Sequence, residues 1–191
     1  MKIEYDRHII HTENGNLLEK EEAQGIREAI KGTIADGGVA KVVALDFSEI
    51  DYIDLVIAKM LVVDLLLHIR NYYNNTRRLL LINLTEQHIV NIQSAINTAQ
   101  LCLLGQDRGA RFHLFGALGS GLKEVLRKVV SMGGDDIRSS DMQQAMRFDN
   151  RQEASAKLSR LHNKGLLFRE PADEGGYLYS SFLLGDPKDE I

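Results

Sequence analysis

Residues 150–179 have the sequence NRQEASAKLSRLHNKGLLFREPADEGGYLY, and this stretch decides how the second half of the chain folds. Its apolar residues recur at helical spacing as far as Gly165, which predicts a helix over residues 150–164 that ends at this glycine. Asn150 is a favourable N-cap residue. Glu153 stands three positions later, where its side chain can bond back to the cap.

Two strands and two further helices complete this pattern. The strands are expected at residues 166–168 and 177–179, on either side of a glycine pair that permits a tight turn. The helices are expected at residues 121–130 and 140–148, with Ser140 as the cap of the second helix. The sequence therefore predicts three helices followed by a two-stranded hairpin.

The third helix carries a spaced motif of serine, leucine, arginine and glycine, and the motif resembles the recognition helix of winged-helix transcription regulators. The matching residues are Ser155, Leu158, Arg160, Leu161, Gly165 and Leu166. The hairpin after the helix is similar to the wing of these proteins. The resemblance implies a winged helix-turn-helix domain, an α+β fold, over residues 118–185.

The resemblance also implies a partner, which is duplex DNA with the third helix in its major groove. A palindromic DNA site would require a dimer of the protein. The residues expected to contact DNA lie on this helix, and they are Arg151, Gln152, Ser155, Lys157, Ser159 and Arg160.

The charge pattern leaves a second partner open. Residues 121–170 carry a net charge of +3, whereas the whole chain carries −4. The expected turn is acidic, with Glu170, Asp173 and Glu174, and Ala156 stands where many DNA-binding relatives have a basic or long polar residue. A winged helix that binds only protein therefore remains an alternative to one that binds DNA.

Strands and helices alternate in the first half of the chain. Strands are expected at residues 2–11, 39–47, 77–84 and 111–115, and helices at residues 19–34, 55–72 and 86–99. The strand at residues 39–47 is a continuous apolar run, which is typical of a strand buried on both faces. This order predicts an α/β sandwich of helices and a mixed, partly parallel sheet.

One segment of this half resembles the STAS domain. It has the sequence ALDFSEI from Ala44, followed by Ile53, Asp54 and a helix, and the similarity extends over residues 1–117. The resemblance implies a module that binds a ligand or a protein partner, or that associates with itself. In the antagonists of this family a phosphorylated serine follows the loop aspartate, but here Leu55 follows Asp54, so that switch is not expected.

Three carboxylates near this loop are candidates for ligand or partner binding. They are Asp46, Asp51 and Asp54. Helix capping by Asp54 and solvation of the others is the alternative explanation, since aspartate is a common N-cap. No metal site is expected, because the six histidines lack zinc-site spacing.

The remaining features limit the class of protein. Cys102 is a single cysteine in an apolar run, which predicts a buried thiol and fits a reducing cytoplasm. The longest apolar stretch contains Lys59, Asp64 and His68, so no membrane partner is expected. No cofactor and no enzymatic activity are expected, because no set of acid, base and nucleophile can be assembled.

The sequence thus predicts a cytoplasmic regulator with three parts. They are the STAS-like domain at residues 1–117, the winged helix at residues 118–185, and a flexible acidic tail at residues 186–191. The regulator would bind DNA and would sense a ligand or assemble with a partner. The alternative is a protein–protein adaptor that does not bind DNA.

Overall fold

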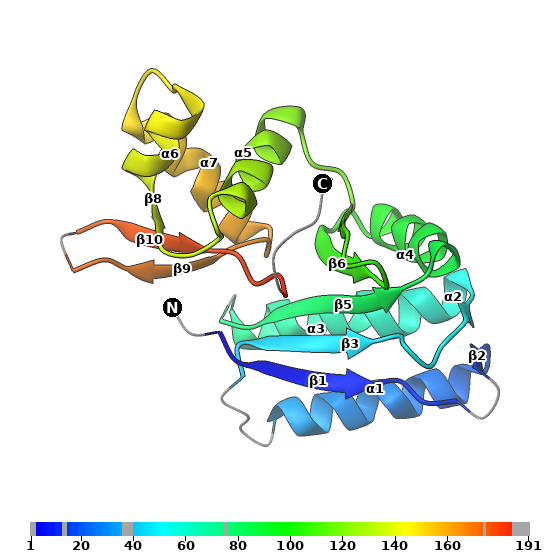
Figure 1. The fold of residues 1–191 in the computed structure, drawn as a ribbon. Coiled ribbons are helices and arrows are strands. Elements are labelled where there is room, and N and C mark those ends of the chain that lie inside the picture. The colour runs from blue at the N-terminus through cyan, green and yellow to red at the C-terminus, as the bar shows by residue number, and fades with distance from the viewer. Residues whose placement is uncertain (1–2, 13–14, 36–39, 75, 174, 185–191) are drawn as a thin grey trace.

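The computed structural model describes residues 3–12, 15–35, 40–74, 76–173 and 175–184. Glu174 and the expected acidic tail lie outside the described residues. The protein is a mixed α/β molecule whose central five-stranded sheet is mostly parallel, with only its last strand antiparallel (Figure 1). In order across the sheet, the strands are β1 (Tyr5–Ile9), β3 (Val42–Asp46), β5 (Arg78–Leu84), β6 (Leu103–Asp107) and β7 (Phe112–Phe115).

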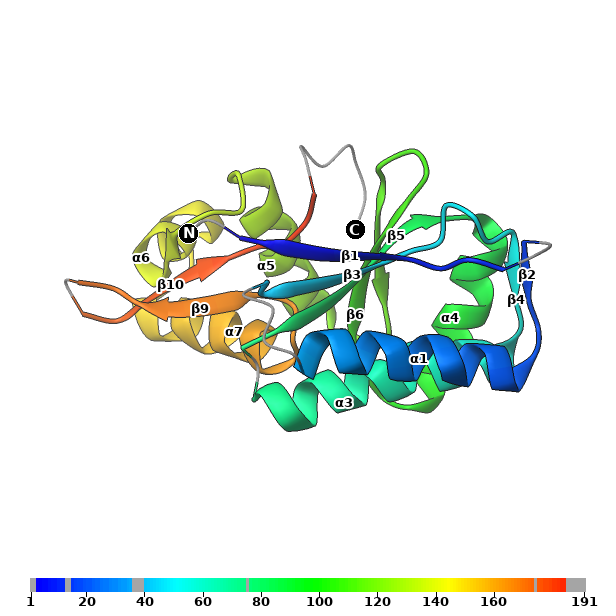
Figure 2. The same ribbon diagram turned by 90° about the horizontal axis from the view of Figure 1, so that it is seen from below.

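One face of this sheet is covered by helices from the first half of the chain, and α1 and α3 lie side by side along it (Figure 2). Val43, Leu45 and Leu81 point into this layer and share its hydrophobic cluster. The helices are α1 (Lys20–Ala35), α2 (Leu55–Ala58), the π-helical turn η1 (Lys59–Val63), α3 (Asp64–Tyr73) and α4 (Glu86–Thr98). The segments α2, η1 and α3 follow one another without a break, as the long apolar helix predicted at residues 55–72 requires.

The other face of the sheet is covered by the C-terminal part of the chain. Val42, Ala44 and Leu80 point to this side and share a second cluster with Leu158 and Leu161. The elements are α5 (Ser120–Ser131), β8 (Ile137–Arg138), α6 (Ser139–Met146), α7 (Arg151–Asn163), β9 (Phe168–Pro171) and β10 (Tyr177–Ser180). The last three strands form an antiparallel sheet with β10 at its centre.

Burial of β3 confirms the prediction from its apolar run, since all five of its residues are buried. Parallel strands covered on both faces have this character, because neither face meets water. Strand β6 was not predicted from the sequence; it is a short strand whose end, Gln106 and Asp107, is polar although buried. Strand β8 and the two-residue parallel pair of β2 (Asn16–Leu17) and β4 (Tyr52–Ile53) were not predicted either.

Two details of helix capping differ from the predictions. Ser140 does not cap α6, because the helix begins one residue earlier and the Asp141 carboxylate accepts a hydrogen bond from the Arg138 backbone at 2.8 Å. Asn150 does cap α7, with its side chain accepting from the Glu153 backbone at 2.9 Å. The Glu153 side chain does not bond back to the cap but pairs with Lys157.

The Cys102 thiol is buried, as predicted, and its burial raises its pKa. Within the described residues, no helix is both long enough and apolar enough to cross a membrane.

Candidate nucleic-acid interface

Helix α7 has a fixed orientation because one side of it belongs to the hydrophobic core. Ala154, Leu158 and Leu161 are fully buried in the cluster that α7 shares with the central sheet. The helix turns 100° per residue, so burial of this stripe leaves Gln152, Arg160 and their neighbours on the opposite side. Gln152 and Arg160 are indeed exposed.

A pocket of about 410 Å³ opens beside the first turns of α7, and we call it the α7 pocket. Three of the six residues predicted to contact DNA line it, which are Arg151, Gln152 and Ser155. The other lining residues are Ser139, Asn150, Gly176, Tyr177 and Tyr179. The pocket thus joins the start of α7 to the start of α6 and to the turn between β9 and β10.

Arg151 lies between these elements and is oriented by them. Its Nε atom donates to the Ser139 hydroxyl at 2.9 Å, and a Cβ atom added to Gly176 would lie 3.5 Å from one of its terminal nitrogens. The guanidinium therefore extends from α6 toward the β9–β10 turn and lies beside Gly176. A planar group with several donors held in this way suits the recognition of a phosphate or a base edge.

Ser159 and Lys157 occupy different surroundings from Arg151. The Ser159 hydroxyl pairs with the hydroxyl of the buried Tyr179 at 2.9 Å, so it packs α7 against β10. Lys157 points toward α5 and α6, where its ammonium lies 4.4 Å from the centre of the Phe148 ring and 3.0 Å from a Glu153 carboxylate oxygen. The structure therefore groups Arg151, Gln152 and Ser155, while Lys157 lies on another side of the helix.

The hairpin formed by β9 and β10 is less negative than its sequence indicates. Lys41, which precedes β3, pairs with the Glu170 carboxylate at 2.5 Å. The Arg169 guanidinium lies over the Tyr177 ring at 4.4 Å and adds a positive charge to the same strand pair. Asp173 remains exposed at the turn.

The end of α7 is attached to the central sheet by a buried arginine. Arg78, at the start of β5, is 3% exposed and donates from Nη2 to the Leu167 carbonyl at 2.8 Å and to Nδ1 of His162 at 3.1 Å. Burial, followed by the charge of Arg78, lowers the pKa of His162 to about 4. The ring is therefore neutral near pH 7. Its Nδ1 atom also lies 3.1 Å from the Leu167 carbonyl, and it accepts from the arginine in the tautomer that carries the proton on Nε2.

The three carboxylates proposed as a ligand site each have a separate partner. Asp46 is completely buried and accepts from the Arg7 guanidinium, the Asn83 amide and the Ser48 backbone. Burial raises the pKa of Asp46, but these hydrogen bonds, with Asn83 first, outweigh burial and hold the pKa below its ordinary value. Asp46 therefore links the carboxyl end of β3 to Arg7 in β1 and to Asn83 in β5.

The other two carboxylates lie in the segment that follows. Asp54 caps α2, because its Oδ1 atom accepts from the Ile57 backbone at 2.7 Å. Asp51 is exposed, with the nearest Arg108 nitrogen 3.7 Å from its Oδ1 atom. Across the part of the chain that the structure describes, no three histidine, cysteine, aspartate or glutamate residues are grouped so that they could hold a metal ion.

The chain matches no protein-family model, and no curated protein or solved structure matches it significantly. Its function is therefore inferred from its own residues. The sequence motif pointed to Arg151, Gln152 and Ser155, but it gave no indication of Ser139 or Tyr177, which complete the same pocket.

Proposed function

We propose that this chain is a non-enzymatic regulatory protein of the cytoplasm that binds duplex DNA through a winged-helix unit at residues 118–185. In this proposal a STAS-like α/β part, at residues 1–117, senses a ligand or assembles with a partner or a second copy. The observation that carries the proposal is the α7 pocket, where Arg151 and Gln152 stand at the exposed start of a helix beside a hairpin turn.

The order of the C-terminal elements supports the winged-helix assignment. From α5 to β10 the order is helix, strand, helix, helix, strand, strand, and the last strand lies at the centre of a three-stranded antiparallel sheet. In winged-helix proteins, which this region resembles, the third helix enters the major groove and the hairpin lies beside it. Helix α7 is the third helix here.

The distribution of charge around α7 is compatible with a phosphate backbone. Arg151 and Arg160 are exposed on α7, and Arg169 lies on the hairpin. The pairing of Glu170 with Lys41 reduces the repulsion that this carboxylate would exert on a phosphate. Affinity for duplex DNA depends on such a balance, because phosphate contacts supply most of its sequence-independent part.

The experiment that tests the proposal is fluorescence anisotropy of the full chain with a mixed-sequence duplex, from low to physiological salt. We expect binding that weakens steeply with salt, since cations bound to DNA are released. The double variant Arg151→Ala with Arg160→Ala should bind about 100-fold more weakly and with a shallower salt dependence, because two charged contacts are lost. Lys20→Ala, an exposed lysine on α1, is the matched control and should bind as the wild type does.

Two results would contradict the assignment. A double variant that retains wild-type affinity would show that α7 is not the helix that contacts DNA. A wild-type protein that does not bind duplex DNA even at low salt would favour the adaptor function instead. Circular dichroism of each variant would show that the helices are retained.

A specific observation favours the adaptor as the second candidate function. Leu18, Leu55 and Val56 are exposed by 48%, 47% and 46%, respectively. The pairing of β2 with β4 brings Leu17 opposite Ile53. The exposed residues Leu18, Leu55 and Val56 follow these two in the chain, so they lie at the same end of the α/β part. Exposed apolar groups of this kind are typical of protein-binding surfaces, and this end lies far from α6 and the β9–β10 hairpin (Figure 1).

A further inference from the structure

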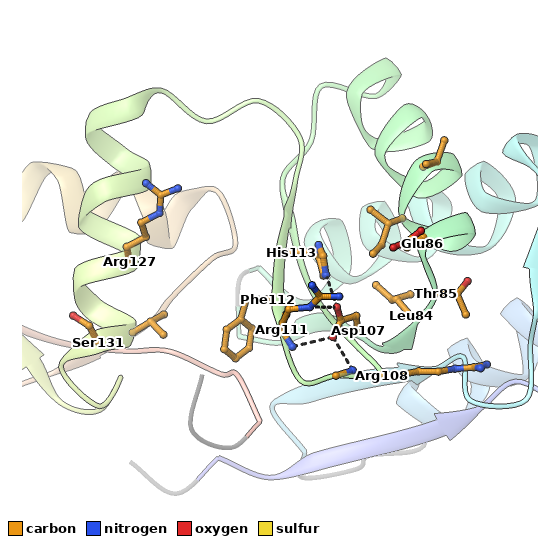
Figure 3. Close-up of a pocket in the computed structure, with 14 residues that line it drawn as sticks. Leu84, Thr85, Glu86, Asp107, Arg108, Arg111, Phe112, His113, Arg127 and Ser131 are labelled. Atoms are coloured by element: carbon orange, nitrogen blue, oxygen red, sulfur yellow. Dashed lines mark hydrogen bonds and ion pairs between the residues drawn. The ribbon is translucent and has the colours of Figure 1, made fainter. Parts of the chain in front are cut away.

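A broad cavity of about 1360 Å³ lies around the hairpin formed by β6 and β7 (Figure 3). Side chains alternate between the two faces of a strand, so consecutive residues of the hairpin line different sides of this cavity. Phe115 is buried in the cluster that contains Ile92 and Ile96 of α4, and Arg111 and His113 share its face by this alternation. We call the part of the cavity between this face and α4 the α4-side site.

Asp107, at the end of β6, orients two polar groups of the α4-side site. It is 7% exposed, and one of its carboxylate oxygens accepts from Arg111 Nε at 2.9 Å and lies 3.2 Å from His113 Nε2. The other oxygen accepts from the backbones of Gly109 and Arg111. Burial raises the pKa of Asp107, but these bonds outweigh burial and hold its pKa below the ordinary value. Asp107 is therefore charged near pH 7.

The bonds to Asp107 leave donors and an acceptor available on Arg111 and His113. Within the described residues, the Arg111 side chain forms its only hydrogen bond and its only ion pair with Asp107, through Nε. Its two terminal amino groups can therefore donate to the carboxylate of a ligand. His113 directs Nε2 to Asp107 and Nδ1 away from it (Figure 3). In a neutral ring that donates from Nε2, Nδ1 is a hydrogen-bond acceptor.

Helix α4 contributes a negative charge and an apolar surface to the same site. Glu86, in the first turn of α4, is exposed and lines the cavity opposite His113 (Figure 3). Arg111 pairs with Asp107 rather than with Glu86, so the Glu86 carboxylate is open to a ligand. Ile89 and Val90 follow Glu86 at helical spacing on the same face, line the cavity as well, and leave Val90 61% exposed.

The charges on this face decide which class of ligand fits it. Asp107 compensates the charge of Arg111, and Glu86 adds a further negative charge. Arg108 also lines the cavity, but its guanidinium is directed to the loop before β4 and donates to the Ser48 carbonyl at 3.2 Å. A simple anion would be attracted by Arg111 and repelled by Glu86, whereas a ligand with both an ammonium and a carboxylate group is attracted by both.

We propose that the α4-side site binds an aliphatic α-amino acid. The carboxylate of the ligand pairs with Arg111, and its ammonium group donates to Glu86 and to Nδ1 of His113. Its aliphatic side chain lies on Ile89 and Val90. The inference rests on the part of the proposed function in which the α/β part senses a ligand, and it names the class of that ligand without requiring DNA binding.

The test is a titration of the ¹⁵N-labelled full chain with L-leucine and with L-valine, followed through the amide chemical shifts in NMR spectra. We expect saturable shifts that fit one site at millimolar concentration or below. After assignment of the spectrum, the largest shifts should belong to residues 86–90 and 107–113, which line the site. The amides of residues 151–155, beside the α7 pocket, should not shift.

Substitutions test the two charged contacts separately. Arg111→Ala and Glu86→Gln should each weaken the affinity for leucine about tenfold, because each removes one charge-assisted contact with the ligand. Arg111→Lys should recover part of the loss. Glu21→Gln is the matched control, since Glu21 is an exposed acidic residue in the first turn of α1, and it should bind leucine as the wild type does. All of these side chains are exposed, so the melting temperature should be retained.

Analogues of leucine test the same contacts from the side of the ligand. The analogue 4-methylpentanoate lacks the ammonium group, and 3-methylbutylamine lacks the carboxylate. Each should bind at least about tenfold more weakly than leucine, because one charge-assisted contact is lost. Glycine, which has both charged groups but no side chain, should also bind more weakly, because it covers no apolar surface on α4.

Four results would overturn the proposal. They are no saturable shifts with either amino acid up to tens of millimolar, saturable shifts that lie outside residues 86–90 and 107–113, equal affinity of leucine for the wild type and both charge-removing variants, and equal affinity for leucine and either singly charged analogue. The titration contains no DNA, so its failure is distinguishable from failure of duplex binding, which anisotropy measures separately.

Discussion

The carboxyl edge of the sheet and the exposed side of α7 both carry closely spaced polar residues. These residues are bonded within the protein at the sheet edge but are accessible on α7. At the sheet edge, Asp46 and Asp54 accept hydrogen bonds from the protein itself, so their oxygens hold strands and start a helix. On α7, Gln152 and Arg160 are exposed, and Arg151 is oriented across a pocket. Polar residues that the fold already satisfies contribute stability, whereas polar residues that the fold positions and leaves accessible are the better candidates for binding.

Among the substitutions that test this difference between the two regions, the largest effect is expected at Asp46. Asp46→Ala should lower the free energy of unfolding by about 3 kcal/mol, because it leaves Asn83 and the Ser48 backbone without their acceptor and Arg7 without its partner. Urea denaturation at pH 7 measures this loss. A loss below about 1 kcal/mol, together with an altered ligand response, would place Asp46 among the binding residues instead.

A change of pH should affect the stability of both regions, because His88 is buried in α4 near the sheet edge and His162 is buried in α7. Burial, with a smaller contribution from Arg108, lowers the pKa of His88 to about 4, and His162 has the same value for the reason given above. Between pH 6.5 and 4 the unfolded chain therefore binds protons at these two histidines that the folded chain does not bind. Their contribution to the free energy of unfolding is fully present above pH 6.5 and is lost as the pH falls.

Each histidine should contribute on the order of 2 kcal/mol to this loss between pH 7 and pH 5. Urea denaturation at the two pH values measures it, and His88→Asn and His162→Asn should each reduce the decline. A decline that is the same in both variants as in the wild type would show that other groups cause it. Unequal reductions would show which of the two regions is the more sensitive to acid.

Arg151 and Lys157 are two positive charges on α7 in different surroundings, and their replacement should affect DNA binding differently. Arg151→Ala should weaken duplex binding about tenfold, since it removes the oriented guanidinium of the α7 pocket. Lys157→Ala should change affinity by less than about twofold, because this lysine is engaged with Phe148 and Glu153 on another side of the helix. Anisotropy at fixed salt separates them, and equal losses would mean that only net charge matters.

The smallest effect is expected at Asp54. Asp54→Ala should cost about 1 kcal/mol of stability, as the loss of an N-cap does. Thermal denaturation measures this change, and Thr85→Ala, which removes the cap of α4, is a matched control. An unchanged melting temperature with a lost partner interaction would move Asp54 from the structural group to the binding group.

Much of the fold could be predicted from the sequence. The helices around residues 20–35, 86–98 and 151–163 match their predicted ranges closely, because apolar spacing and flanking caps define a helix within its own residues. Strand β6 was not predicted, because its last two residues are polar and are buried only by segments that are distant in the sequence. Gln106, for example, donates to the carbonyl of Leu184 at 3.1 Å.

The candidate sites could be predicted less completely. The helical motif identified Arg151, Gln152 and Ser155, but it also gave Lys157 and Ser159, because a motif does not state which neighbours cover a side chain. The pocket beside the β6–β7 hairpin was not predicted at all. Its lining comes from β5, α4, the hairpin and α5, which lie far apart in the sequence.

The sequence by itself determined the main helices and most strands of the central sheet, where Asn150 and Asp54 cap helices, and that β3 is buried on both faces. These properties depend on residues a few positions apart, so a single chain segment contains them. The tertiary structure alone decided that Asp107 supports Arg111 and that Arg151 meets Ser139. Such pairs form only when packing of the core brings elements together, and it is packing that decides which polar side chains remain accessible for binding.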